Sequence, residues 1–259
     1  GKIDEAPMLY IGDKLGTING PKFDIAVDPL EGTKFTANGE SNAFSVLAIS
    51  EQGGLLSAPD TYMEKIVIGT NLPENLMDLD NSIEKNMSLL AKAKKKNISD
   101  LRACVLKRPR HDHIVKELNR LNVKINYITD GDIAGALSVI GDKPNNDIYY
   151  STGGAPEGVV VAAALSCYGG QIQGRLVLDD EEKIRAKKLG ILDFKKKYNI
   201  NDMVKGDVIF CATGVTTGDL ASGVKDLGNE YEVNTFALHK RQKIIKKFTN
   251  IYNKWAHFL

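Results

Sequence analysis

Asp28-Pro29-Leu30-Glu31-Gly32-Thr33 ends the apolar run Ile25-Ala26-Val27 with two carboxylates and a hydroxyl. Pro29 has a fixed φ and no N–H, so it excludes a helix start here and predicts that the chain leaves a strand in an extended turn. Two carboxylates about 4 Å apart repel by on the order of 4 kcal/mol at an effective dielectric of about 20. A cation would cancel this repulsion, and oxygen ligands suit Mg²⁺ or Mn²⁺. A β-turn with solvated acids is the alternative interpretation.

Composition limits the classes of function. The 259 residues carry 34 Lys and Arg against 33 Asp and Glu, a net charge of +1. No overall charge therefore recruits nucleic acid or anionic lipid, and any affinity for phosphate must be local. The cysteines (Cys104, Cys167 and Cys211) lie in apolar runs, which is typical of core side chains in a reducing compartment. No run approaches the roughly 18 apolar residues of a membrane span, and no leader pattern opens the chain, so we expect a cytoplasmic protein.

The pattern of the chain changes near residue 96. Residues 1–96 indicate mixed α and β structure, with strands at 44–49 and 62–68 and a helix that ends near Lys94. Beyond residue 97, strands alternate with helices, which predicts a doubly wound α/β sheet. The strands are expected at 103–106, 123–128, 148–150 and 208–211, and the helices at 114–121, 133–140 and 159–167.

Polar clusters follow these four strands. They are residues 108–111 (Arg-Pro-Arg-His), 130–132 (Asp-Gly-Asp), 153–158 and 213–219. Open α/β sheets bind ligands at the carboxyl ends of their strands, so four clusters on one edge predict a ligand site there.

Each cluster also has a structural interpretation. Arg108 and Arg110, held by Pro109, suit the oxygens of a phosphate, but they could form a solvated basic turn. The 130–132 cluster suits sugar hydroxyls, or an Asp-Gly turn with Asp132 as a helix N-cap. Glu157 opens a predicted helix and could simply favour its N-terminus by roughly 0.3–1 kcal/mol. A dinucleotide-binding turn is disfavoured there because the G-x-G-x-x-G spacing is absent.

Several motifs together resemble a known family. Residues 28–33 match D-P-[IL]-[DE]-G-[ST], the metal-binding motif of the lithium-sensitive sugar and inositol phosphatases. Together with the flanking motifs given next, residues 28–33 make the whole chain resemble a class II fructose-1,6-bisphosphatase. The flanking motifs are residues 3–9 (IDEAPML), 58–65 (APDTYMEK), 108–112 (RPRHD), 130–132 (DGD) and 153–158 (GGAPEG).

The resemblance implies a two-subdomain sugar-phosphatase fold, α+β and then α/β, with layered mixed sheets and helices. Residues 1–96 would form the metal-binding subdomain and residues 97–259 the substrate-binding subdomain. The reaction implied is metal-dependent hydrolysis of the 1-phosphate of fructose 1,6-bisphosphate in gluconeogenesis, with two Mn²⁺ or Mg²⁺ ions.

The resemblance also assigns site residues. Asp28, Glu31 and Glu157 would hold the metals, Thr33 would orient the attacking water, and the Leu30 carbonyl is a candidate further ligand. Asp28, Glu31 and Thr33 are the expected catalytic group. Contacts with the substrate are expected from Glu31, Gly32, Thr33, Tyr62, Arg108, Pro109, Arg110, Asp130, Gly131, Asp132 and Gly154, whereas His111 is expected to be structural.

The start of the chain limits this interpretation. Gly1-Lys2 stands directly before the 3–9 motif, which suggests a missing N-terminal segment that in relatives supplies further metal carboxylates. Our hypothesis is that this polypeptide is inactive or binds metal weakly while its full-length parent is active. We name no ligand at Asp4 or Glu5.

Other functions stay open. A phosphatase of the same superfamily acting on sedoheptulose 1,7-bisphosphate or inositol phosphates would keep the metal acids and change the sugar contacts. A non-catalytic sugar-phosphate-binding protein would keep the ligand site without the metals. The expected partners are a small sugar bisphosphate and further copies of the chain in a dimer or tetramer, with no nucleic acid or membrane.

Overall fold

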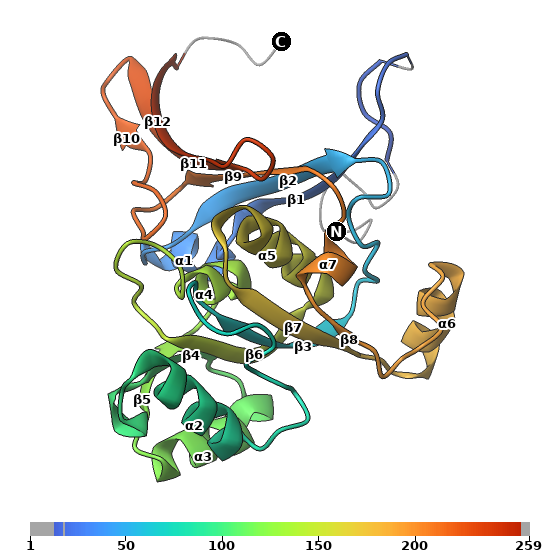
Figure 1. Ribbon diagram of the computed structural model, residues 1–259. Coiled ribbons are helices and arrows are strands. Elements are labelled where there is room, and N and C mark those ends of the chain that lie inside the picture. Colours follow the sequence, from blue (N-terminus) through green and yellow to red (C-terminus); the bar gives the residue numbers. More distant parts are fainter. Residues whose placement is uncertain (1–12, 18, 255–259) are drawn as a thin grey trace.

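The computed structural model describes residues 13–17 and 19–254, so the motif at residues 3–9, with Asp4 and Glu5, lies outside the described residues. Two sheets, the first antiparallel and the second mixed, enclose a layer of helices, and further helices lie beneath the second sheet (Figure 1). The predicted layered fold of mixed sheets and helices is confirmed.

In the described residues the strands are β1 (Phe23–Glu31), β2 (Phe44–Glu51), β3 (Tyr62–Ile68), β4 (Arg102–Leu106), β5 (Lys124–Ile128), β6 (Ile148–Gly154), β7 (Gln171–Val177), β8 (Lys197–Tyr198), β9 (Val208–Gly214), β10 (Lys225–Asp226), β11 (Glu230–His239) and β12 (Ile244–Asn253). The helices are α1 (Thr33–Asn38), α2 (Ile83–Lys94), α3 (Asp112–Arg120), α4 (Asp132–Leu137), α5 (Ala155–Tyr168), α6 (Asp180–Lys188) and α7 (Ile200–Met203), with 3₁₀ turns η1 (Ile98–Asp100) and η2 (Pro109–His111).

The first sheet has the order β1-β2-β9-β11-β10, with β12 paired to β11, and all its neighbours are antiparallel. Its edge strand β1 runs through Pro29 to Glu31, with a shift in register between Asp28 and Glu31. The expected extended turn after residue 27 was therefore wrong. Proline is tolerated because an edge strand has no partner on one side to receive the missing N–H.

The second sheet has the order β5-β4-β6-β3-β7-β8. Strand β4 is parallel to β5 and β6, whereas β3 is antiparallel to β6 and β7. The predicted doubly wound sheet was wrong because β3 is inserted between β6 and β7, and because β9 lies in the first sheet beside β2. Each sheet thus takes strands from both sides of residue 96, and the expected boundary there does not coincide with the division between the sheets.

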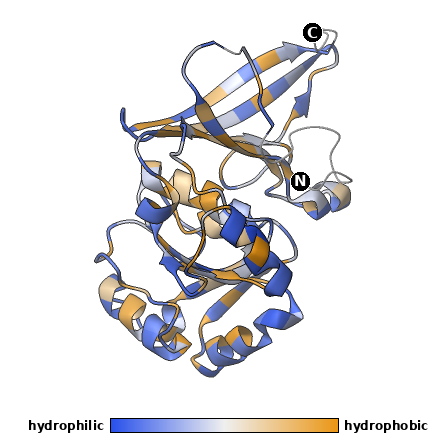
Figure 2. Cartoon of the chain, turned by 90° about the vertical axis from the view of Figure 1, so that its right-hand side faces the viewer, coloured by the Kyte–Doolittle hydropathy of each residue, from blue (hydrophilic) through white to orange (hydrophobic). Residues whose placement is uncertain are grey.

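Helix α5 lies between the two sheets (Figure 1). Residues 158–165 of this helix are buried on all sides, as expected for a helix that is apolar all round. Their core includes Val46 and Phe210 of the first sheet and Met63 of the second. A separate core packs α2 and α3 under the second sheet. Hydrophobic residues are concentrated in the helices between the two sheets (Figure 2).

The outer face of the first sheet carries exposed apolar side chains. Phe23 and Ile25 of β1 are 54% and 51% exposed, and Ile209 of β9 is 39% exposed. None of the helices that the structure describes covers this face (Figure 1). No described helix is long and apolar enough to cross a membrane.

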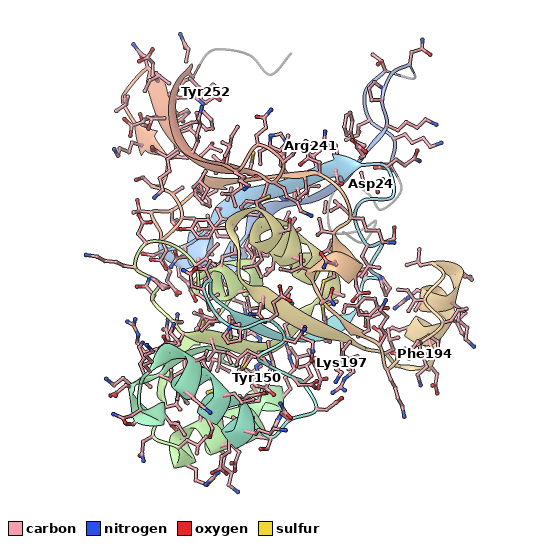
Figure 3. The ribbon with its side chains drawn as sticks, in the orientation of Figure 1. Asp24, Tyr150, Phe194, Lys197, Arg241 and Tyr252 are labelled. Carbon is pink, nitrogen blue, oxygen red and sulfur yellow. The ribbon has the colours of Figure 1, made fainter. Side chains whose placement is uncertain are left out.

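An ion-pair network closes the edge of the second sheet. Lys197 of β8, labelled in Figure 3, contacts Asp78 and Asp80. Arg175 of β7 contacts Asp80 and Glu64. The network ties β3, β7 and β8 to the loop before α2. Partly exposed pairs of this kind contribute little individually, so we assign the network to local positioning of that loop.

Candidate functional site

Two hydrogen bonds connect the end of β1 to the strand ends of the second sheet. The backbone N–H of Ile133, in the first turn of α4, donates to Oε1 of Glu31 over 2.6 Å. The N–H of Lys34, in the first turn of α1, donates to Oδ2 of Asp130 over 3.0 Å. The carboxylate predicted at the end of β1 and the acidic cluster predicted after β5 are therefore brought together.

The turn between β1 and α1 requires glycine. Gly32 has a φ of 78°, in the left-handed region, and a Cβ there would meet the ring of Phe35. Gly131 has a φ of 76°, and a Cβ there would meet the same ring. Phe35 therefore packs between the two predicted loops, which can approach this closely only because both positions lack a side chain.

Glu31 is 5% exposed. Burial raises its pKa well above the usual range, the carboxylates of Asp132 and Asp28 raise that pKa further, and the N–H of Ile133 opposes the rise. Asp28 in turn accepts from the N–H of Leu30 over 3.0 Å. Asp28 is thus close enough to Glu31 to disfavour the charge of Glu31, and this agrees with the repulsion that the sequence predicted for this motif.

Glu157 lies in the first turn of α5, as predicted. A Cβ at Gly154 would collide with its carboxylate, so the side chain folds back over the glycine. Burial raises the pKa of Glu157, Asp132 and Asp28 raise it further, and Lys65 opposes the rise.

Asp132 lies at the start of α4 and is 9% exposed. Its Oδ2 accepts from the buried ammonium of Lys65 and its Oδ1 from the hydroxyl of Tyr149. The N-cap of α4 is Gly131, which has no side chain, so the alternative role of Asp132 as N-cap was wrong. The Lys65 ammonium also donates to the carbonyl oxygen of Gly154 over 2.7 Å.

Thr33 is the first residue of α1 and is exposed. Its Oγ1 lies 3.5 Å from Oδ2 of Asp130, the oxygen that also accepts from the N–H of Lys34. This places the hydroxyl predicted to orient water beside the loop predicted to bind sugar. The carboxylate of Asp130 can fix the direction of that hydroxyl.

Both predicted phosphate-binding arginines follow β4. Arg108 donates from Nη1 to the carbonyl of Thr129 over 2.8 Å. Arg110 donates from Nε and Nη2 to the carbonyl of Thr152, and its guanidinium lies 4.5 Å from the ring centroid of Tyr62. Tyr62 is 51% exposed at the start of β3. A planar cation held by a carbonyl and an aromatic face is suited to an anionic ligand.

His111 is structural, as expected. It is fully buried, its Nδ1 lies 2.6 Å from the carbonyl oxygen of Leu106, and its Nε2 accepts from the N–H of Thr152 over 2.8 Å. Burial lowers its pKa, which keeps the ring neutral. The bond to Thr152 attaches residues 108–111, which we call the arginine loop, to β6.

The acidic side chains offer carboxylate oxygens, which are the ligands that a hard cation prefers. Glu31 is buried and Glu157 is half-buried, and the pKa values of both carboxylates are raised partly by the same neighbours, Asp132 and Asp28. Within residues 13–17 and 19–254, no group of three or more His, Cys, Asp and Glu side chains is arranged to hold a metal ion. The described residues therefore provide the oxygen donors and the mutual repulsion of a cation site, but not a complete set of ligands in place.

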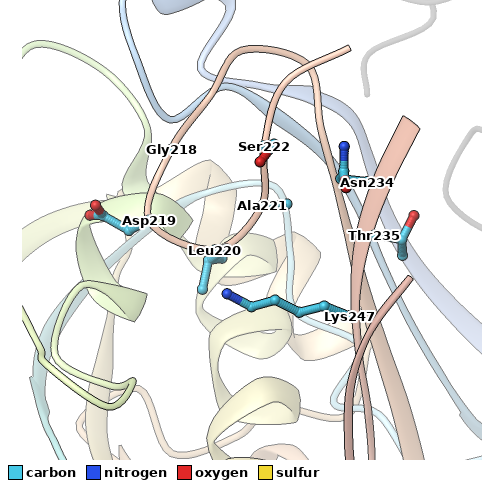
Figure 4. A pocket seen from close by; sticks show the side chains of 8 residues that line it. All are labelled: Gly218, Asp219, Leu220, Ala221, Ser222, Asn234, Thr235 and Lys247. Atoms are coloured by element: carbon cyan, nitrogen blue, oxygen red, sulfur yellow. The ribbon is translucent and has the colours of Figure 1, made fainter. Parts of the chain in front are cut away.

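The cavity of about 120 Å³ between the loop after β9 and strands β11 and β12 is separate from these groups (Figure 4). The cluster at 213–219, predicted to share the ligand site, contributes Gly218 and Asp219 to it instead. It holds none of the other predicted site residues. It is lined by Gly218, Asp219, Leu220, Ala221, Ser222, Asn234, Thr235 and Lys247.

Sequence reasoning missed Lys65 and Tyr149. Lys65 is a charged residue in a strand of mainly apolar residues, and its side chain is fully buried. A lysine inside an apolar strand run is a signal that a buried anion faces it, because an unpaired buried charge is strongly unfavourable. Tyr149 carries a weaker signal, since a tyrosine in a buried strand needs a partner for its hydroxyl.

Comparison with known proteins gives a match over nearly the whole chain. Residues 1–252 match the family described as bacterial fructose-1,6-bisphosphatase, glpX-encoded. The fructose-1,6-bisphosphatase class 2 of Haemophilus influenzae is 39% identical over 267 residues, which cover 97% of this chain and 80% of that protein. The Escherichia coli K12 fructose-1,6-bisphosphatase 1 class 2 and the Shigella flexneri class 2 protein are also 39% identical, over 97% of this chain and 79% of each.

Proposed function

Because the chain belongs to the bacterial class 2 fructose-1,6-bisphosphatase family, we propose that it hydrolyses the 1-phosphate of fructose 1,6-bisphosphate. The products are fructose 6-phosphate and phosphate, and the pathway is gluconeogenesis or related sugar-phosphate metabolism. The observation that supports this most is the meeting of the Glu31 carboxylate of β1 with the loops that carry Asp130 and Asp132.

The residues divide between the two ends of the substrate. Asp28, Glu31 and Glu157 would hold divalent ions, Mn²⁺ or Mg²⁺, beside the phosphate to be cleaved. Such ions supply Lewis-acid neutralisation of the phosphoryl oxygens and activation of water, and a pair of them is the usual arrangement in phosphatases. Thr33 orients the attacking water. Its own hydroxyl is directed by Asp130.

The arginine loop takes the phosphate that is not cleaved. Arg110 has two N–H groups on the Thr152 carbonyl and its ring-stacked face on Tyr62, so its position is defined before substrate binds. Preorganisation of this kind lowers the cost of binding. Two arginines after one strand favour a bisphosphate over a monophosphate. Pro109, Gly131 and Gly154 contribute backbone atoms to the substrate pocket.

Phosphate release tests the proposal. The 259-residue chain is assayed with fructose 1,6-bisphosphate in Mn²⁺ or Mg²⁺, with and without EDTA. We expect metal-dependent release that EDTA abolishes, faster than with sedoheptulose 1,7-bisphosphate or an inositol phosphate. Substrate-induced thermal stabilisation without phosphate release would favour a binding protein.

Replacing Arg110 by Met should raise the KM for fructose 1,6-bisphosphate at least about tenfold with a smaller change in kcat, because the contact binds ground and transition states alike. Arg110→Lys should not restore KM, since an ammonium cannot reproduce the planar fork. Lys116→Met, on the exposed face of α3, removes the same charge away from the site and serves as the control. A KM unchanged in Arg110→Met would contradict the assignment.

We expect the protein to be cytoplasmic and a dimer or tetramer, as the sequence predicts. Gel filtration with light scattering measures the second property directly.

A further inference from the structure

We infer that Lys65, Asp132 and Tyr149 form a buried positioning network for the site, and that the Asp132 carboxylate serves this network instead of binding a sugar hydroxyl. The inference rests on the proposed function for its kinetic consequences. Its structural part stands on the contacts alone.

Lys65 is the central member of the network. Its side chain is completely buried, and its ammonium contacts Oδ2 of Asp132 and the carbonyl oxygen of Gly154. A Cβ at Gly158 would meet the Lys65 side chain and that of Met63, so α5 presents a glycine where the lysine passes. The ammonium is therefore enclosed by β3, β6, α4 and α5. A cation in such a place is tolerated only when anionic and carbonyl oxygens surround it.

Asp130 and Asp132 differ although they flank one glycine. Asp132 has one oxygen on Lys65 and the other on Tyr149 and is 9% exposed. A Cβ at Gly153 would collide with this carboxylate, which shows how closely β6 covers it. Asp130 is partly exposed and contacts groups at the mouth of the site, namely Thr33, Lys34 and Arg108. Of the two, only Asp130 is placed to meet a substrate hydroxyl with its side chain.

The network reaches the proposed metal carboxylates through the backbone. Asp132 fixes the first turn of α4, and the next residue, Ile133, donates its N–H to Glu31. Lys65 holds the carbonyl of Gly154, over which the Glu157 carboxylate folds. One ammonium thus positions two separate acidic side chains. Partners of this kind around metal ligands typically change metal affinity or activity 10–100-fold when they are removed.

The first experiment compares Asp132→Asn with Asp130→Asn. For Asp132→Asn we expect a fall in kcat of about 10–100-fold, a KM for fructose 1,6-bisphosphate within about threefold of wild type, and weaker Mn²⁺ binding measured by dye competition. For Asp130→Asn we expect the larger change in KM. A tenfold rise in KM for Asp132→Asn with kcat unchanged would make Asp132 a sugar ligand and overturn the inference.

The second experiment is a double-mutant cycle on unfolding temperature. Lys65→Met leaves the buried Asp132 charge without its counter-ion and should lower the melting temperature strongly. Adding Asp132→Asn to Lys65→Met should raise the melting temperature above that of Lys65→Met alone, because the unpaired charge is gone. Additive losses would show that the two side chains do not act together and would overturn the network.

Tyr149→Phe, which removes one hydroxyl, should weaken Mn²⁺ binding less than Asp132→Asn does.

The two experiments separate failure of the inference from failure of the proposed function. A wild-type protein that releases no phosphate from fructose 1,6-bisphosphate would contradict the function. The unfolding cycle needs no substrate or metal and would still decide whether Lys65 and Asp132 act together.

Discussion

Replacement of Glu157 by Gln is expected to lower kcat for fructose 1,6-bisphosphate at least about 100-fold. Removing one group that stabilises charge in a transition state typically has an effect of this size. Glu157 is the proposed ligand that α5 supplies, and its carboxylate is held against Gly154 at the start of that helix. Gln keeps the shape of the side chain and removes its charge. We therefore expect kcat and Mn²⁺ affinity to fall while the protein still folds.

Glu181→Gln is the matched control. Glu181 is exposed on α6, which lies beyond the β8 edge of the second sheet in Figure 1. We expect this variant to retain wild-type kcat and Mn²⁺ affinity. A Glu157→Gln protein with wild-type turnover and an unchanged requirement for Mn²⁺ would remove Glu157 from the metal ligands.

Replacement of Glu31 by Gln is expected to reduce activity by a similar factor and, at the same time, to stabilise the metal-free protein. The amide oxygen can accept from the N–H of Ile133, and the amide nitrogen can donate to Asp28. The variant therefore keeps the local hydrogen bonds and loses a buried charge that repels Asp28 and Asp132. Functional sites often carry such destabilising charges, which substitution relieves at the expense of activity.

The gain in stability should depend on pH. Because the pKa of Glu31 is raised in the folded protein, its contribution to stability is present below the unfolded pKa and is lost as the pH rises through the folded value. The advantage of Glu31→Gln should thus be largest near pH 8 and shrink on acidification. Urea unfolding in EDTA at pH 5 and pH 8 measures this. If the wild-type protein were more stable than Glu31→Gln at pH 8, the proposed repulsion would be contradicted.

Local sequence was sufficient for most of the elements. The apolar run after Asp60 forms β3, the helical spacing that ends at Lys94 forms α2, and the small apolar residues after Glu157 form α5. These patterns depend on side-chain period, which is a property of the segment itself. Strand pairing is not such a property, and this explains why the parallel assignment of the β9 region was wrong.

The candidate site divides in the same way. Asp28, Glu31 and the Arg108–Arg110 turn could be named from residue type and spacing, together with the family resemblance. The sequence marks Lys65 only as a lysine in an apolar strand run. Its partners could not be named, because they meet it only where β3 passes beside β6, α4 and α5.

The sequence by itself determined several of the strands and helices, among them β3, α2 and α5, and which oxygens and guanidinium groups are available to a ligand. Only the tertiary structure decided which of the two aspartates around Gly131 faces the solvent and which is buried against Lys65 and Tyr149. Residues that are neighbours in the chain can differ this much because burial and charge pairing depend on segments that are far away in sequence. Lys65 and Asp132 are separated by 67 positions.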